Sequence, residues 1–207
     1  MSSYRRPAIT ALVYRDSAGE PIPYGERWRS GSPPEESYSR TSNLARFQPL
    51  QTIADALISH LGETFDVVVD DDPTWAADLL HPRDDVTRAV RVTPASGAPL
   101  TLVYTSFPSV ILHAGALFEL LYPVCGCDAC DESWSTLADE LEWQVLAVAA
   151  GGLREDFDDA DLVTLLEDPD RGSLGGRRAS DDIAPARLER ARVALAAGEG
   201  WDAWPLR

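Results

Sequence analysis

The sequence predicts an α+β fold: a single domain in which an antiparallel sheet of about four or five strands is packed by two main helices. Between residues 86 and 122, short runs of alternating apolar and polar residues are separated by turn residues, which is typical of antiparallel strands. Two other stretches, 49–61 and 132–150, repeat apolar residues at helical spacing. A chain of 207 residues that is 44% hydrophobic can bury one sizeable core.

Residues 1–48 predict an irregular N-terminal extension. A weak alternation and a turn between residues 9 and 24 indicate a loose hairpin, which its prolines would confine to a sheet edge. The segment 32–38 contains a double proline with Ser and Gly neighbours and is expected to be a surface loop. We expect Trp28 and Tyr38 to attach this extension to the body of the protein.

The first main helix is predicted over residues 49–61, with Gly62 as its C-terminal cap. The β-branched run at 65–69 then predicts a buried strand. Asp72 followed by Pro73 has the form of an N-cap with proline at the first helical position, so a short helix should follow.

The middle of the chain predicts the sheet. Residues 86–93, 100–104 and 110–114 alternate in the manner of strands, while 117–122 fits either a strand or a helical turn. The helix predicted over 132–150 carries an apolar stripe and is stopped by two glycines.

The last quarter of the chain is less regular. Residues 168–184, rich in Gly, Arg and Ser, are predicted to form a mobile loop, and a further helix is predicted over 185–197. Two tryptophans, Trp201 and Trp204, lie near the C-terminus, where aromatic residues usually dock on their own core.

The charge restricts the classes of partner. The chain has 18 Lys plus Arg and 34 Asp plus Glu, for a formal net charge of −16, and its basic residues are all arginine. This balance argues against nucleic acid and anionic membranes, whereas it permits a basic protein partner. No apolar run is long enough to span a membrane, and no apolar stretch follows the first basic residues. We therefore expect a cytoplasmic protein, and the arginine-rich composition suggests a high-GC bacterial source.

All three cysteines lie within six residues, at Cys125, Cys127 and Cys130. Their odd number and close spacing favour free thiols or metal ligands over a disulfide framework. Cys127 and Cys130 have the spacing of a zinc knuckle, in which a tight turn directs two thiolates at one ion. Gly126 would let the chain fold back so that Cys125 joins them, which makes zinc the predicted metal.

Zinc generally takes four ligands, so the predicted site lacks one. His113 is the histidine nearest in sequence, but it would reach the cysteines only if the segment between them curls back; His60 and His81 are not placed by this reasoning. Asp128, Asp131 and a water molecule are the other candidates.

Two further interpretations need no metal. Asp128 and Asp131 resemble the cap and first-turn residues of the helix that follows, which would put Cys130 near a helix N-terminus, where the dipole lowers a thiol pKa. This favours a dithiol redox site, although the acidic neighbours oppose thiolate formation. In the last interpretation, the cysteines are inert residues packed at a turn.

Several strings in the chain resemble an uncharacterised family of actinobacterial proteins, a domain of unknown function. The resemblance extends over nearly the whole chain and implies no activity or site residue. The strings are Tyr24-Gly25-Glu26-Arg27-Trp28, Pro33-Pro34-Glu35-Glu36-Ser37-Tyr38, Tyr122-Pro123-Val124-Cys125-Gly126-Cys127-Asp128-Ala129-Cys130-Asp131-Glu132, Ala149-Ala150-Gly151-Gly152 and the Trp-x-x-Trp-Pro tail.

No nucleophile elbow, phosphate-binding loop, dinucleotide fingerprint or zinc-protease motif occurs in the sequence. The leading interpretation is a soluble, non-enzymatic cytoplasmic protein with a structural zinc knuckle. The alternatives are an acidic, immunity-like inhibitor module that masks a basic partner, and a zinc- or thiol-dependent enzyme.

Overall fold

The computed structural model describes residues 3–10, 12–29, 31–158, 161–196, 198 and 200–207. Residues 1–2, 11 and 30 of the predicted N-terminal extension therefore lie outside the described residues. The predicted meander is confirmed as a five-stranded antiparallel sheet in the order β1-β2-β3-β4-β5. Its strands are Val67–Asp71, Val86–Pro94, Leu100–Thr105, Val110–Ala114 and Phe118–Tyr122.

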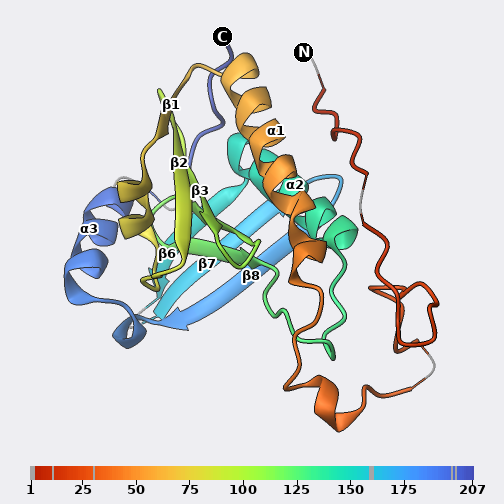
Figure 1. The fold of residues 1–207 in the computed structure, drawn as a ribbon. Coiled ribbons are helices and arrows are strands. Elements are labelled where there is room, and N and C mark those ends of the chain that lie inside the picture. The colour runs from red at the N-terminus through yellow and green to blue at the C-terminus, as the bar shows by residue number, and fades with distance from the viewer. Residues whose placement is uncertain (1–2, 11, 30, 159–160, 197, 199) are drawn as a thin grey trace.

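The two main helices are α1 (Pro49–Thr64) and α2 (Trp134–Ala149), and they pack on one face of this sheet. Figure 1 shows them side by side. Helix α1 runs past Gly62, so the expected glycine cap is wrong. The helix ends instead where Phe65 turns to extended backbone while its N–H still donates to the Leu61 carbonyl.

Strand β1 is less buried than its β-branched sequence suggests, because it lies at the edge of the sheet and, within the described ranges, pairs with β2 alone. Val68 and Val69 are exposed. The predicted N-cap after it is confirmed: the Asp72 carboxylate accepts from the Thr74 N–H. The short helix that it caps is the 3-10 helix η3 (Pro73–Asp78).

A second, three-stranded antiparallel sheet follows α2, and the sequence did not predict it. It consists of β6 (Leu153–Asp158), β7 (Asp161–Asp168) and β8 (Gly172–Ala179). The segment 168–184, predicted to be a mobile loop, is therefore largely strand, followed by the 3-10 helix η4 (Ser180–Asp182). Strand β8 has no apolar alternation, and its order comes from backbone pairing with β7 along its whole length.

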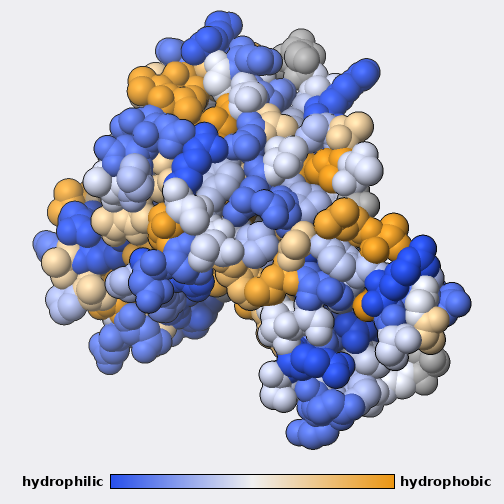
Figure 2. All heavy atoms as spheres, viewed as in Figure 1, coloured by the Kyte–Doolittle hydropathy of each residue, from blue (hydrophilic) through white to orange (hydrophobic). Residues whose placement is uncertain are grey.

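The C-terminal part of the chain contributes helix α3 (Pro185–Leu195) and a docked tail. Trp204 is buried in the main hydrophobic cluster with both helices, and its indole N–H donates to the Ala98 carbonyl at 2.9 Å. No helix in the described part of the chain is long and apolar enough to cross a membrane. Figure 2 shows a largely hydrophilic surface on which the hydrophobic patches are broken up by polar side chains.

The N-terminal extension is irregular, as predicted, apart from the short 3-10 helices η1 (Glu35–Ser37) and η2 (Leu44–Phe47). Among the described residues, the expected hairpin is reduced to an isolated bridge between Arg15 and Pro21. Figure 1 shows the extension, red to orange, running beside the helices and away from both sheets. Residues between Arg27 and Arg46 of the extension contact the loop that carries the cysteines.

Candidate metal centre

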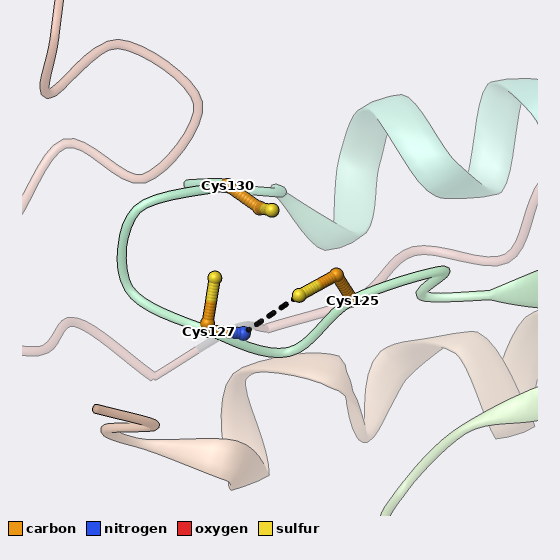
Figure 3. A group of neighbouring side chains, drawn as sticks. All are labelled: Cys125, Cys127 and Cys130. Atoms are coloured by element: carbon orange, nitrogen blue, oxygen red, sulfur yellow. Dashed lines mark hydrogen bonds between the residues drawn. The ribbon is translucent and has the colours of Figure 1, made fainter. Parts of the chain in front are cut away.

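The loop between β5 and α2 brings the three cysteines together. The Sγ atoms of Cys125, Cys127 and Cys130 all lie within 4.8 Å of one another. Figure 3 shows the three thiols converging from the two limbs of the loop, with Cys130 just before α2. Cys130 is exposed and the other two are partly buried, so the centre lies at the surface.

These separations suit one ion better than a cluster. A Zn–S bond of about 2.3 Å in tetrahedral geometry puts two thiolate sulfurs about 3.8 Å apart. An iron–sulfur cluster spreads three thiolates over at least two iron atoms, which holds some of the sulfurs further apart. The spacing therefore matches a mononuclear, thiolate-ligated metal.

The local hydrogen bonds shift the pKa values of the thiols in opposite directions. The pKa of Cys127 is lowered, chiefly because the backbone N–H of Cys130 is directed at the Cys127 sulfur. Hydrogen bonds from the other two thiols add to this shift. The Cys127 N–H also lies 3.5 Å from the Cys125 sulfur. Hydrogen bonds from Cys130 to the two other sulfurs raise the pKa of Cys130 to about 12. The Cys127 thiol therefore loses its proton more easily than an ordinary cysteine, and a bound cation would replace the protons that the other two thiols share.

Glu132 links the two ends of the cysteine loop. Its carboxylate accepts from the Cys125 N–H at 3.0 Å and from the Val124 N–H at 3.3 Å. Helix α2 begins at Trp134 with Ser133 as its N-cap, since the Ser133 hydroxyl accepts from the Thr136 N–H. The expected capping role of the aspartates is therefore wrong.

Asp128 instead fastens the loop to the N-terminal extension. Its buried carboxylate accepts from Arg40 Nε at 2.7 Å, and from the Ser42 N–H and hydroxyl at 2.9 and 2.8 Å. Burial alone would raise the pKa of Asp128, but the hydrogen bonds from Arg40 and Ser42 outweigh it and hold the pKa below its usual range. Backbone hydrogen bonds of Asp128 and Ala129 to the carbonyls of Arg40 and Ser37 add to this contact.

Asp131 makes a second connection to the extension. Its carboxylate accepts from the Arg27 N–H at 2.8 Å, and the Arg27 Nε lies 3.8 Å from the same group. The indole N–H of Trp28 donates to the Asp128 carbonyl at 3.2 Å. The expected attachment of the extension through Trp28 is confirmed, whereas Tyr38 is exposed.

Arg46 makes the third connection. Its guanidinium is buried, lies against the rings of Tyr24 and Phe47, and donates to the Gly126 carbonyl at 3.0 Å. Gly126 itself faces Phe107, so closely that a Cβ there would lie 2.3 Å from the ring. We call Arg27, Arg40, Ser42 and Arg46 the clamp, because they hold the cysteine loop from the extension.

The structure places the other candidate ligands away from the thiols. His113 lies on β4, opposite Glu119 of β5, and contacts Arg187. His60 packs against Tyr4, and His81 lies beside Glu119. Among the described residues, no histidine or carboxylate joins the group formed by the three sulfur atoms. The Asp128 carboxylate is occupied by Arg40 and Ser42. One Asp131 oxygen accepts from the Arg27 N–H, while Oδ1 has no hydrogen-bond partner among the described residues.

The sequence identified the loop but not the clamp. Arg27 and Trp28 occur in one of the strings that carry the family resemblance. Nothing in the sequence indicates that Arg40, Ser42 and Arg46 contact the cysteine loop. Their contacts join residues that are 80 to 104 positions apart.

One family comparison bears on this chain. A family model described as "Family of unknown function (DUF6226)" matches residues 10–207. No curated protein and no solved structure matches the chain. The match agrees with the expected resemblance in extent and brings no site residue with it.

Proposed function

Since the chain belongs to the family of unknown function DUF6226, we propose a function from the cysteine loop itself: the protein binds one zinc ion through Cys125, Cys127 and Cys130. The observation that carries this proposal is the convergence of three sulfur atoms within 4.8 Å of one another. Soft thiolate ligands select zinc, copper(I) or iron–sulfur clusters, and the spacing favours a single ion.

The charge around the loop supports an anionic metal–thiolate group. Three thiolates on Zn²⁺ carry a net charge of −1, which a neighbouring cation stabilises. Arg46 supplies one, because it is buried beside the loop and its pKa is lowered chiefly by that burial. The nearby carboxylate of Asp128 is already compensated by Arg40, and that of Asp131 in part by Arg27.

The role that we propose is structural, without enzymatic chemistry. Glu132 already links the two ends of the loop through the N–H groups of Val124 and Cys125. The ion would add a second link, between Cys125, Cys127 and Cys130. With three protein ligands, the fourth coordination position falls to water or to a donor from another molecule. Because Cys130 is exposed, we expect that position to lie at the surface.

Metal content and affinity test the proposal. Protein purified without added metal should contain one zinc per chain by mass spectrometry of the elements. Competition with a chromophoric chelator should show that Cys127→Ser and Cys130→Ser each weaken zinc binding by more than about 100-fold, beyond the usual effect of losing an outer-shell partner. His81→Ala is the control, because His81 lies beside Glu119 rather than the thiols. A protein without zinc that fails to take it up would refute the proposal.

The fourth position has its own test. In Co²⁺-substituted protein, added imidazole or a small thiol should change the absorption spectrum if the position is filled by exchangeable water. An unchanged spectrum would mean that the protein itself supplies a fourth ligand, and the open site would be rejected.

A dithiol switch is the second candidate, because the thiols of Cys127 and Cys130 are adjacent and the pKa of Cys127 is lowered. Thiolate character controls the reactivity of a cysteine. Mild oxidation of metal-free protein would then give a disulfide detectable by peptide mass spectrometry, reversible with a dithiol reductant. A protein that keeps all three thiols under these conditions excludes the switch.

A further inference from the structure

A row of polar residues crosses the five-stranded sheet on the face opposite α1 and α2. Arg91 of β2 pairs with Thr101 of β3, Thr101 with His113 of β4, and His113 with Glu119 of β5. Residues two positions away on each strand point to the same face and form an apolar cluster with Leu79. The polar row therefore interrupts a face that is otherwise hydrophobic.

Helix α3 and the segment around η3 cover this row. Figure 1 shows both on the opposite side of β2 and β3 from α1. Arg187 of α3 donates to His113 Nε2 at 3.0 Å and to the Ala77 carbonyl at 3.3 Å. Arg91 forms an ion pair with Asp78 at the end of η3.

The hydrogen bonds of the row are incomplete. Burial, with the nearby charges of Arg187 and Arg91, lowers the pKa of His113 to about 3, so the ring is neutral at physiological pH. Its Nε2 accepts from Arg187, which leaves the proton on Nδ1, and Glu119 lies 3.7 Å from that nitrogen. In the described part of the chain, His113 Nδ1, Thr101 Oγ1 and Arg187 Nε are buried atoms without a hydrogen-bond partner. Buried polar groups are normally paired, so this set indicates a missing ligand or ordered water.

A cavity of about 130 Å³ lies beside this cluster. It is lined by Arg91, His113, Arg187 and Arg190, together with Asp78 and small residues of the β4–β5 turn and α3. Its volume equals the share of roughly four water molecules in the liquid, at about 30 Å³ each. A tetrahedral oxyanion fits in this space, whereas a drug-sized ligand does not.

The charges of the cavity favour an anion. Asp78 compensates Arg91, and the Glu119 carboxylate is directed at the Leu80 N–H at 2.6 Å and at His81. Neither Arg187 nor Arg190 forms an ion pair within the described residues. Burial lowers the pKa of Arg187. The charges of Asp78 and Glu119 oppose this shift, and the charges of Arg190 and Arg91 add to it. A cation in this position is stabilised by a bound anion.

We propose that this cavity binds a small tetrahedral oxyanion of the phosphate class, held by Arg187 and Arg190. Arginine presents N–H donors in a planar fork that matches phosphate oxygens. The Arg187 Nε, which lacks a partner, gains one when the anion binds. His113 holds the guanidinium of Arg187 in place through Nε2 and is therefore a positioning residue.

Isothermal titration of the 207-residue chain with inorganic phosphate tests this site, with chloride and acetate at equal ionic strength as references. We expect saturable binding of phosphate, and at least a tenfold loss in Arg187→Gln and in Arg190→Gln, because each substitution removes charge-assisted hydrogen bonds to the anion. Arg190 is exposed, so its variant should fold normally even if Arg187→Gln does not. Arg192→Gln, on the same helix but over Phe157, is the matched control and should bind as wild type does.

The other outcomes of the titration distinguish free phosphate from the phosphate group of a larger molecule, and phosphate from other anions. Glycerol phosphate that binds as well as inorganic phosphate would identify the terminal phosphate of a larger molecule as the occupant, and weaker binding would identify the free ion. Acetate binding as strongly as phosphate would overturn the tetrahedral class. Phosphate that gives no more heat than chloride, or binding that persists in both arginine variants, would overturn the site.

Discussion

The clamp makes a quantitative prediction for Asp128. Replacing it with alanine removes the acceptor of three hydrogen bonds, from Arg40 Nε and from the N–H and hydroxyl of Ser42. Arg40 is about half exposed and can turn to water, but the two Ser42 groups lie at the partly buried contact. An unsatisfied buried group costs about 1–3 kcal/mol, so we expect Asp128→Ala to lower the free energy of unfolding by about 2–4 kcal/mol.

Urea denaturation followed by circular dichroism measures this loss. Asp139→Ala is the control, because Asp139 forms an exposed ion pair with Arg6, which is worth about 0–1 kcal/mol. The same variants should differ in zinc affinity, since only Asp128→Ala releases the loop. The reasoning is refuted if the Asp128 variant loses no more stability than the Asp139 variant.

The contribution of the Asp128 carboxylate to stability depends on pH, and the direction follows from linkage. The pKa of Asp128 is lower in the folded protein than in the unfolded chain, where a carboxyl of this type titrates near about 3.9. Its stabilisation is therefore complete above that pH and is lost as the pH falls through the lower, folded value. We expect the stability gap between wild type and Asp128→Asn to be constant near neutral pH and to close in acid below about pH 4. A gap that stays constant into acid would contradict the charged role of Asp128.

Two further substitutions separate the loop from the helix that follows. Gly126→Ala puts a Cβ 2.3 Å from Phe107, so we expect it to cost about 1–3 kcal/mol and to weaken zinc binding; Gly31→Ala, with nothing described within 4 Å, should change neither. Ser133→Ala removes the N-cap of α2 and should cost about 1 kcal/mol while leaving zinc affinity unchanged, as denaturation and chelator competition would measure. A matching fall in zinc affinity in Ser133→Ala would show that the helix cap and the loop are not independent.

The elements that sequence reasoning predicted are those with a local signal. The apolar stripes of α1 and α2 and the alternation of β2 to β4 each repeat within a few residues, so the pattern suffices to locate them. Strand β8 has the sequence Gly-Ser-Leu-Gly-Gly-Arg-Arg-Ala and carries no such repeat. Its conformation is decided by pairing with β7, which is a property of the tertiary structure.

The candidate site divides in the same way. Three cysteines in one short string are recognised from the sequence alone. Their spacing correctly indicated that the three sulfur atoms lie close together. The roles of Asp128 and Asp131 could not be predicted, because each has a plausible local use as a helix cap, while its actual partners are Ser42, Arg40 and Arg27 in an irregular segment about 100 residues earlier. His113 was considered as a zinc ligand from its sequence distance alone, and its strand register directs it to Glu119 and Arg187 instead.

The closeness of the three cysteines in sequence affects how metal would act on folding. Cys125 and Cys130 remain within six residues of each other even in an unfolded chain, so that chain also presents a chelating peptide. A ligand that binds both states shifts the folding equilibrium only by the ratio of its two affinities. Zinc should therefore raise the unfolding midpoint much less than its affinity suggests, unlike metals held by ligands from distant elements. The folded state should bind zinc more tightly than the unfolded chain because the clamp holds the cysteine loop in place. The difference between these two zinc affinities measures what the first 48 residues contribute to the site.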